Sequence, residues 1–461
     1  MRAQIILSIL VFSLLRPALN FSQETIIRGG WTFDSAKGEF FANTGIVIRG
    51  GKFMKVGAGL TDQDLSGAEV VELSDNDYIL PGLFDLHAHY NVNLFGTRRR
   101  DETTVMPVVF LANGVTSTFP AGEYDPEEML ALRKAINRGE QIGPRLFNSG
   151  PYFGPARIGW NPEITTQEIF HEVDYWAEQG VSGFKAKRIS PQHLQALIER
   201  AHWHGLTVTG HLDSGFRNTI NPRDAILMGI DRIEHFLGGD AISPDKPAYS
   251  TLVDFKPGTP EFERIVKLYL NYNVYFDATL TAYGYFGERK EGYDYWTDEQ
   301  RFLTPFMREQ IAKKSARRFI EQFEKIYWVK RKTVKAFYDA GGGRLITLGT
   351  DHSSTGEYLA GFSIHRELEA FVLSGIPAAA AIQFATTNAA KALNMDEKLG
   401  SIEPGKFADL CVVKGNPLED IKNTRNVFLV MKAGKIYHSV ELLKSVEGKL
   451  GPSNAEEVEE W

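Results

Sequence analysis

Short apolar segments alternate with helix-like segments through the middle of this 461-residue chain, and this alternation restricts its fold more than any other feature. Each apolar segment ends in polar residues, and helix-period stretches lie between these segments. The expected strands cover residues 78–87, 115–119, 144–149, 183–187, 206–211, 232–235, 273–278 and 344–350. Repeated strand–helix units pair their strands in parallel, and eight such units close into a barrel. We therefore predict an α/β protein with a (β/α)8 TIM barrel, whose chemistry lies at the C-terminal ends of the strands.

The two ends of the chain follow a different pattern. Gly-Gly pairs at 29–30 and 50–51 separate short β-branched runs, as is typical of hairpins, and similar runs return near the C-terminus. We predict one small β-sandwich built from both termini, comprising residues 23–80 and 396–461. The barrel then comprises residues 81–395.

The first 22 residues have the features of a signal peptide. A positive start at Arg2 is followed by an apolar run over 5–15, which is too short to span a bilayer, and then by a processing region. This predicts a periplasmic or secreted protein without a stable membrane anchor. A membrane-anchoring segment is the alternative interpretation.

The net charge and the single cysteine exclude some partners and some kinds of metal ligand. The net charge of −7 argues against a nucleic-acid partner, which would require a basic surface. The single cysteine, Cys411, lies in an apolar run and is expected to be a small buried hydrophobe. Any metal must therefore be held by His, Asp, Glu or Lys.

Residues of the types that bind metals stand at the ends of the expected strands. The first strand runs into His87 and His89, whose spacing of two aims both imidazoles to the same side. The fourth, fifth, sixth and eighth strands carry Lys185, His211, His235 and Asp351. Because strand ends of a barrel converge on one mouth, this distribution predicts a metal centre suited to zinc or a similar divalent ion.

Several motifs resemble the amidohydrolase superfamily, in particular its imidazolonepropionase-like and prolidase-like dipeptidase branch. The resemblance rests on Leu-Pro-Gly-Leu-Phe-Asp-Leu-His-Ala-His at 80–89, Ile-Glu-His at 233–235 and Leu-Gly-Thr-Asp at 348–351. Two further segments, 386–393 and 400–410, are also similar to that family. The resemblance covers nearly the whole mature chain, and it implies a barrel joined to a β-sandwich made from both termini.

The resemblance also implies a role for each candidate ligand. His87 and His89 would bind the more buried of two zinc ions, and His211 and His235 the outer one. Asp351 would bind the buried ion and act as the catalytic proton shuttle. Lys185 would bridge both ions as a carbamate formed with carbon dioxide, with Lys187 on the same strand face as the rival for that role.

Loops at the strand ends supply candidates for substrate binding. These are Tyr90 after the histidine pair, Arg157 after the third strand, Tyr283 after the seventh, and His352 after Asp351. They could bind a substrate carboxylate or shape an oxyanion site. Ordinary loop packing is the alternative for each of them.

The predicted function is a secreted metal-dependent amidohydrolase that cleaves an amide C–N bond with metal-activated hydroxide. The expected substrate is a small molecule or short peptide, either peptide-like or an N-acyl amino acid. Hydrolysis of a cyclic amide, as in imidazolonepropionase, and deamination are alternatives that share the same ligands. A catalytically inactive binding scaffold is a further alternative, and homo-oligomerisation is left open.

Overall fold

The protein is described here from a computed structural model. The described residues are 24–57, 59–96, 99–212, 219–235, 237, 252–253, 255–285, 287, 298–313, 320–352 and 358–461. The expected signal peptide, residues 1–22, lies outside them.

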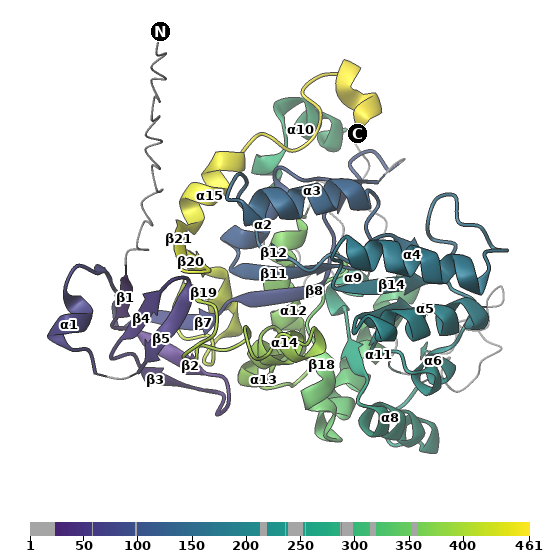
Figure 1. Cartoon of the computed structure of the whole chain (residues 1–461), viewed down its shortest axis with the longest axis horizontal. Helices are drawn as coiled ribbons and strands as arrows, with labels where there is room; N and C mark the ends of the chain where they lie inside the picture. Colours follow the sequence, from purple (N-terminus) through teal and green to yellow (C-terminus); the bar gives the residue numbers. More distant parts are fainter. Residues whose placement is uncertain are drawn as a thin grey trace, which may run out of the picture.

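The centre of the molecule is a barrel of parallel strands wrapped by helices (Figure 1). Its strands are β8 (Leu83–Ala88), β11 (Val115–Pro120), β12 (Arg145–Leu146), β14 (Gly183–Lys187), β15 (Thr207–His211), β16 (Arg232–Glu234), β17 (Tyr275–Asp277) and β18 (Ile346–Thr347). They form two arcs, one ordered β12-β11-β8 and the other running from β14 to β18, preceded by the short β13 (Tyr152–Phe153).

Backbone hydrogen bonds close the two arcs into a ring. The Ser182 N–H donates to the Asn148 carbonyl at 2.8 Å, and the Leu86 N–H donates to the Leu348 carbonyl at 3.0 Å. All eight expected strands are present in the expected order, although several are shorter than the apolar segments from which we predicted them. The TIM-barrel prediction is confirmed.

Helices cover the outside of the barrel, and their starting points can be read in the sequence. The helices are α2 (Met106–Ala112), α3 (Pro126–Asn137), α4 (Thr166–Glu178), α5 (Pro191–Trp203), α6 (Pro222–Met228), α8 (Pro260–Tyr272), α11 (Glu321–Asp339) and α12 (Ala360–Leu373). Four of them begin with proline directly after a capping side chain, as at Ser190 before α5 and Asn221 before α6. A cap followed by proline suits the helix start because proline lacks the N–H that would otherwise be unsatisfied there.

The other α-helices among the described residues are short. They are α1 (Asp62–Leu65), α9 (Leu280–Gly284), α10 (Pro305–Ala312), α13 (Ala378–Phe384), α14 (Thr387–Ala392) and α15 (Ser439–Val446). No helix of the described ranges is both long and apolar enough to cross a membrane.

The first expected strand, residues 78–87, proves to be two strands. β7 (Asp77–Pro81) belongs to a terminal sheet and β8 to the barrel, with Gly82 between them. The Gly82 N–H donates to the Asp409 carbonyl at 2.9 Å, and a Cβ at this position would lie 2.1 Å from the Thr116 hydroxyl oxygen. One apolar run therefore serves two sheets, because glycine lets the chain pass closely between them.

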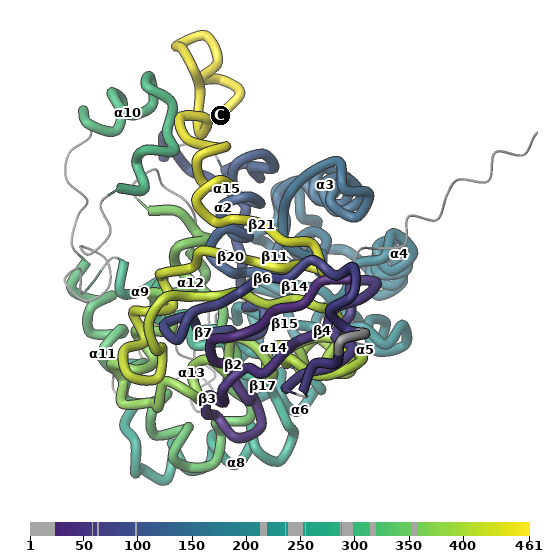
Figure 2. Tube along the Cα trace, turned by 90° about the vertical axis from the view of Figure 1, so that its left-hand side faces the viewer, coloured from purple at the N-terminus to yellow at the C-terminus, as the bar shows by residue number. Residues whose placement is uncertain are grey.

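Strands from both termini build a two-sheet β unit beside the barrel (Figure 2). One sheet has the order β5-β4-β1-β6 and the other β21-β20-β19-β7-β2-β3. The strands are β1 (Thr25–Arg28), β2 (Trp31–Asp34), β3 (Glu39–Ala42), β4 (Ile46–Arg49), β5 (Lys52–Val56), β6 (Glu69–Glu72), β19 (Leu410–Lys414), β20 (Val427–Lys432) and β21 (Lys435–His438). Side chains such as Ile27, Phe53, Leu410 and Leu429 fill the space between the sheets. Cys411 is buried in β19 as expected.

The segment after β21 contacts both the β unit and the barrel: α15 lies against β20 and β21 as well as α2. Helix α15 packs against α2, where the Ser439 hydroxyl donates to the Ala112 carbonyl at 2.7 Å. Further along, the Thr304 N–H donates to the Leu450 carbonyl. The segment that follows β21 thus connects the β unit to the barrel, and the assignment of residues 396–461 to the β-sandwich stays a prediction.

Candidate metal centre

The candidate ligands meet at the C-terminal end of the barrel, where several strands deliver one or two side chains each. His87 lies in β8 and His89 follows it, Lys185 lies in β14, and His211 ends β15. His235 and Asp351 come directly after β16 and shortly after β18. Apart from the Asp351 carboxylate, which is about a quarter exposed, these side chains are buried.

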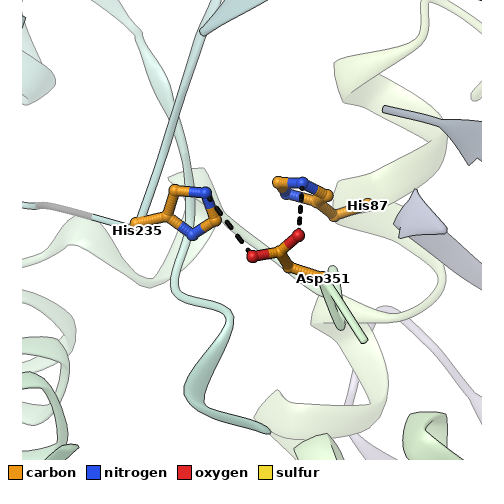
Figure 3. A group of neighbouring side chains, drawn as sticks. All are labelled: His87, His235 and Asp351. Atoms are coloured by element: carbon orange, nitrogen blue, oxygen red, sulfur yellow. Dashed lines mark ion pairs between the residues drawn. The ribbon is translucent and has the colours of Figure 1, made fainter. Parts of the chain in front are cut away.

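The Asp351 carboxylate is the centre of the cluster (Figure 3). Its Oδ1 lies 2.8 Å from His89 Nε2 and 3.2 Å from His87 Nε2. Its Oδ2 lies 3.7 Å from His235 Nε2. His87, His235 and Asp351 each offer one ligand atom within 4.8 Å of the other two. Three strands therefore present donor atoms to one small volume.

The backbone turns sharply where two of these side chains enter the site. His235 has φ of 67° and Asp351 has φ of 46°, both in the left-handed region that residues other than glycine rarely adopt. The His235 N–H donates to the Asp277 carbonyl and the Asp351 N–H to the His87 carbonyl. Such conformations cost about 1–3 kcal/mol and persist where the surrounding structure enforces them, typically at functional sites.

Lys185 reaches the same cluster from β14. Its Nζ lies 3.4 Å from His87 Nε2 and forms a buried ion pair with Glu234. Burial lowers the pKa of Lys185, although Glu234 partly opposes this shift. Burial by itself would raise the pKa of Glu234, but His87, Lys185 and Arg232 hold it at about 2. The geometry thus places Lys185, rather than Lys187, against His87.

His211 and Thr279 orient His235 from two sides. The His211 and His235 rings are 4.2 Å apart between centroids. Thr279 Oγ1 lies 2.7 Å from His235 Nδ1, and Lys330 Nζ of α11 lies 3.2 Å from the same hydroxyl oxygen. Because Thr279 occupies Nδ1, the Nε2 of His235 faces Asp351.

The electrostatics favour neutral imidazoles beside an ionised carboxylate. Burial lowers the pKa of His87 to about 3 and lowers that of His89 as well. Burial and the neighbouring His211 lower the pKa of His235. Burial would raise the pKa of Asp351, but His87, His235 and hydrogen bonds from the histidines hold it well below its usual range. Neutral imidazole and carboxylate are the forms that coordinate a metal.

Asp85 supports the histidine pair from behind. Its Oδ1 accepts from the His87 and Thr350 N–H groups, each at 3.0 Å, and its Oδ2 accepts from the Thr350 hydroxyl at 2.7 Å. It thereby ties β8 to the segment that carries Asp351. Asp85, His87 and His89 alternate along one strand face, so the period of two could have identified this residue.

Other residues that contact the candidate ligands were not identified from the sequence. Glu234 was visible only as part of the Ile-Glu-His motif, and Asp277, Thr279 and Lys330 carried no motif signal. Asp277 Oδ2 lies 3.9 Å from His87 Nδ1, and the Thr347 hydroxyl donates to Asp277 Oδ1 at 3.1 Å. Their roles depend on contacts between distant segments.

Two of the four expected substrate-binding residues lie beside the cluster. The Tyr283 ring centroid is 6.1 Å from that of His235, with Lys330 Nζ 3.7 Å above the tyrosine ring. His352 follows Asp351, and its Nδ1 lies 2.6 Å from the Ser363 hydroxyl. Both side chains are buried.

The other two are engaged elsewhere. The Tyr90 hydroxyl lies 2.9 Å from Thr118 Oγ1 inside the core, and its ring packs on Phe110. Arg157 forms an ion pair with Glu172 of α4. These contacts agree with the packing alternative for both residues.

A separate cleft of about 760 Å3 lies near the opposite end of β18, between the β unit and the barrel. It contains none of the candidate ligands. Its lining includes Ser35, Tyr338, Arg344, Gln383, Asn388, Lys391 and Asp396.

The donor set fits a divalent metal. Three imidazoles and one carboxylate converge, and Nδ1 of His89 is buried with no hydrogen-bond partner among the described residues. An array of neutral nitrogen and anionic oxygen donors is what zinc and related ions require. The barrel and this centre define a metal-dependent hydrolase of the (β/α)8 class.

Comparison with known proteins gives the family. The model of the amidohydrolase family matches residues 78–437, which cover most of the chain and all candidate ligands. The chain belongs to the amidohydrolase family.

Individual relatives match over different lengths. A 5-methylthioadenosine/S-adenosylhomocysteine deaminase from Teredinibacter turnerae is 39% identical over 83 residues, which cover 16% of this chain and 18% of that protein. Adenine deaminase 4 from Rhizobium meliloti is 33% identical over 114 residues, covering 23% of this chain and 19% of that protein. This chain thus matches less than a fifth of the length of either curated relative.

Solved structures match over nearly the whole fold. A Xaa-Pro dipeptidase with bound methionine has a TM-score of 0.66 at 23% identity, covering 90% of this chain and 100% of that one. Phenylurea hydrolase B has a TM-score of 0.69 at 18% identity, covering 93% and 100%. These similarities confirm the fold, and the family match together with the ligand cluster identifies a metal-dependent amidohydrolase.

Proposed function

We propose that the protein hydrolyses an amide C–N bond in a peptide-like or N-acyl amino acid substrate, using two divalent ions, expected to be zinc, bridged by a carbamate on Lys185. The observation that carries the proposal is the position of Lys185 Nζ, 3.4 Å from His87 Nε2 within the histidine–aspartate cluster. A bridging group is useful only where two ions are held. The approach of a second imidazole pair, His211 and His235, provides donors for the second ion.

The chemistry of Lys185 agrees with this role. A lysine must be neutral to attack carbon dioxide, and burial lowers the pKa of Lys185 toward that form. Carbamate formation joins the Nζ of the neutral amine to the carbon of carbon dioxide and releases one proton, so that the uncharged amine becomes an anion. The surrounding neutral imidazoles would then be complemented by two anions, Asp351 and the carbamate.

Divalent ions at this centre would lower the pKa of a water molecule and polarise the scissile carbonyl. Asp351 can accept the proton of the attacking water and transfer it to the leaving nitrogen, because its carboxylate is the only part of the cluster that is substantially exposed among the described candidate ligands. His235 is held in one orientation by Thr279.

Deamination is the second candidate, because both relatives found by sequence are deaminases. Such a reaction would replace an exocyclic amine of a purine-type ring and needs only one ion. The position of Lys185 favours the two-ion amide hydrolase instead. The structural similarity to a Xaa-Pro dipeptidase supports the same preference.

The test combines metal analysis with a substrate panel. Purified protein is expected to contain two equivalents of metal and to hydrolyse aminoacyl-proline, other dipeptides or N-acyl amino acids, with loss of activity on chelation and recovery on adding zinc. Intact-mass measurement should show one carbon dioxide on the parent and none on Lys185→Met. Full activity in the metal-free protein would refute the proposal, and activity on adenosine-type substrates alone would establish the deaminase.

We also propose that the protein acts outside the cytoplasm, on the basis of its signal-like N-terminus. Fractionation of expressing cells and N-terminal sequencing of the mature protein test this. Cleavage after Ser22 is expected, whereas an intact N-terminus on cytoplasmic protein would overturn the proposal.

A further inference from the structure

Lys330 is a buried cation that the proposed chemistry does not use. It lies in α11, and burying a lysine is costly unless its N–H groups find acceptors. Its Nζ donates to the Thr279 carbonyl at 3.4 Å and to the Thr279 hydroxyl oxygen at 3.2 Å. The same Nζ lies 3.7 Å from the centre of the Tyr283 ring. These contacts all go to the segment that leads from β17 into α9.

A buried carboxylate on another helix holds the same segment. Glu367 of α12 accepts from the Leu280 and Thr281 N–H groups at 2.8 and 2.7 Å, and these belong to the first turn of α9. Burial lowers the pKa of Lys330 and raises that of Glu367, and the charge of each residue opposes the shift of the other. The start of α9 is therefore held by two opposite charges, one from α11 and one from α12.

The backbone of Thr279 needs this support. Its φ of 48° lies in the left-handed region, which a β-branched residue adopts only where the surrounding structure enforces it. Both the carbonyl and the hydroxyl of Thr279 accept from Lys330. One amine thus contacts the backbone and the side chain of the residue that supports His235.

The hydrogen bonds of the Thr279 hydroxyl determine which nitrogen of His235 carries a proton. A hydroxyl has one proton to donate and two lone pairs with which to accept. The proton goes to the Ala278 carbonyl at 2.8 Å, and one lone pair accepts from Lys330. The remaining contact, 2.7 Å to His235 Nδ1, then requires a proton on Nδ1. A neutral imidazole protonated there has its free lone pair on Nε2, the nitrogen that lies 3.7 Å from Asp351.

We propose that Lys330 is a positioning residue that holds the Thr279 hydroxyl in this orientation and so fixes His235 as the tautomer protonated on Nδ1, with Nε2 available to the outer ion. The inference rests on the proposed two-ion centre, because it assigns a support to a ligand of the outer ion. Without Lys330 the hydroxyl can rotate and donate its proton to Nδ1. The ring proton then moves to Nε2, where it blocks coordination.

The first measurement is the protonation state of each histidine nitrogen in the metal-free protein, by nitrogen NMR of protein labelled at histidine. Loss of one ring signal in His235→Asn assigns the signal of His235. The parent should show His235 protonated on Nδ1, at a pH where the ring is neutral, and Lys330→Met should show a mixture of both tautomers. Lys332→Met, at an exposed position of the same helix, should resemble the parent. This readout depends neither on metal nor on turnover.

The second measurement is zinc affinity, by competition with a fluorescent chelator. Lys330→Met should weaken the binding of one ion by about 10- to 100-fold, as is typical when a metal ligand loses its supporting interaction, and should leave the other ion unchanged. Because Lys330 acts through Thr279, the same substitution should cause no further loss in a Thr279→Val background. Such non-additivity identifies two residues that act as one unit.

A second variant separates this role from a loss of stability. Lys330→Met leaves the buried charge of Glu367 without its compensating cation, which destabilises the fold. The double variant Lys330→Met, Glu367→Gln removes both charges, retains an acceptor for the α9 N–H groups, and should show the same tautomer mixture and the same loss of zinc affinity. The proposal is overturned if His235 stays protonated on Nδ1 alone in both variants, or if the losses in Lys330→Met and Thr279→Val add. A parent that binds a single ion, with the tautomers changing as expected, would instead refute the two-ion centre of the proposed function alone.

Discussion

His89 Nε2 lies 2.8 Å from Oδ1 of Asp351, although 262 positions separate the two residues in the chain. The contact joins the first barrel strand to the last, at the seam where the ring of strands closes. His87 approaches the same oxygen at 3.2 Å. The contact at which the first and last barrel strands meet therefore also brings candidate metal ligands together.

Replacing Asp351 should abolish catalysis while leaving the fold intact. Asp351→Asn keeps the shape of the side chain but removes the negative charge that binds metal and accepts a proton. We expect kcat to fall by at least about 10²-fold, the lower range for loss of a general acid–base group, with reduced metal content. Steady-state hydrolysis and metal analysis measure both. Asp396→Asn, at the exposed rim of the distant cleft, should behave like the parent; an active Asp351→Asn enzyme would contradict the assignment.

Thr279 should control metal affinity through His235. Thr279→Val removes the hydroxyl that lies 2.7 Å from His235 Nδ1 but keeps the branched shape. Removing such a supporting hydrogen bond typically weakens metal binding about 10- to 100-fold. Competition with a fluorescent chelator measures this change. Thr279→Ser restores the hydroxyl and should recover most of the affinity, whereas equal losses in both variants would assign Thr279 to packing alone.

Gly349 should tolerate no side chain. A Cβ at this position would lie 2.4 Å from Asp277 Oδ2 and 2.6 Å from the His87 Cβ. We expect Gly349→Ala to lower the free energy of unfolding by about 1–3 kcal/mol and to displace His87, because the surrounding core is closely packed. Denaturant unfolding and metal titration measure the two effects. Gly59→Ala, with no neighbour within 4 Å of the added Cβ, should change stability by less than about 0.5 kcal/mol. An equal effect at both glycines would contradict the steric explanation.

His365 should make the protein sensitive to acid. Burial, with Arg425 and Arg366 nearby, lowers the pKa of His365 to about 3, whereas the unfolded chain titrates near 6.5. Between these values the unfolded state binds a proton that the folded state does not, so stability falls as the pH falls, by up to about 1.4 kcal/mol per pH unit. This contribution should disappear in His365→Asn.

The measurement is urea unfolding between pH 7 and pH 4 with excess chelator, which removes the contribution of metal binding. His171→Asn, at an exposed position of α4, is the matched control and should keep the slope of the parent. An unchanged slope in His365→Asn would show that other groups cause the acid sensitivity.

The sequence predicted those features that recur with a fixed period or stand at a strand end. Alternating strand and helix patterns indicated the barrel, and His87, His89, Lys185, His211, His235 and Asp351 all lie at its C-terminal mouth. The division of one apolar run into β7 and β8 was not predictable from hydrophobicity, because both strands are apolar. The requirement for glycine at position 82 comes from the close contact with Thr116, which belongs to a distant segment. The contact of α15 with α2 was not predictable, because an amphipathic segment does not reveal which surfaces it will cover.

Residues that support the site through tertiary contacts were not predictable. Thr279 and Lys330 meet because α11 packs against α9, which Thr279 directly precedes, and neither residue belongs to a recognisable motif. Glu234 is adjacent to His235 in sequence, yet its partner Lys185 lies on another strand. Side chains of this kind are identified only when distant segments are placed side by side.

The mixed origin of the β unit has a consequence for the growing chain on the ribosome. β7 pairs with β2 on one side and with β19 on the other. Pro81 therefore gains its partner in the sheet, Leu410, only after that residue has been synthesised. Until nearly the whole chain has been synthesised, β7 has an unpaired edge of the kind that promotes aggregation. The sheet β5-β4-β1-β6 contains only N-terminal strands, but the sheet that contains β7 cannot be completed before the barrel has emerged.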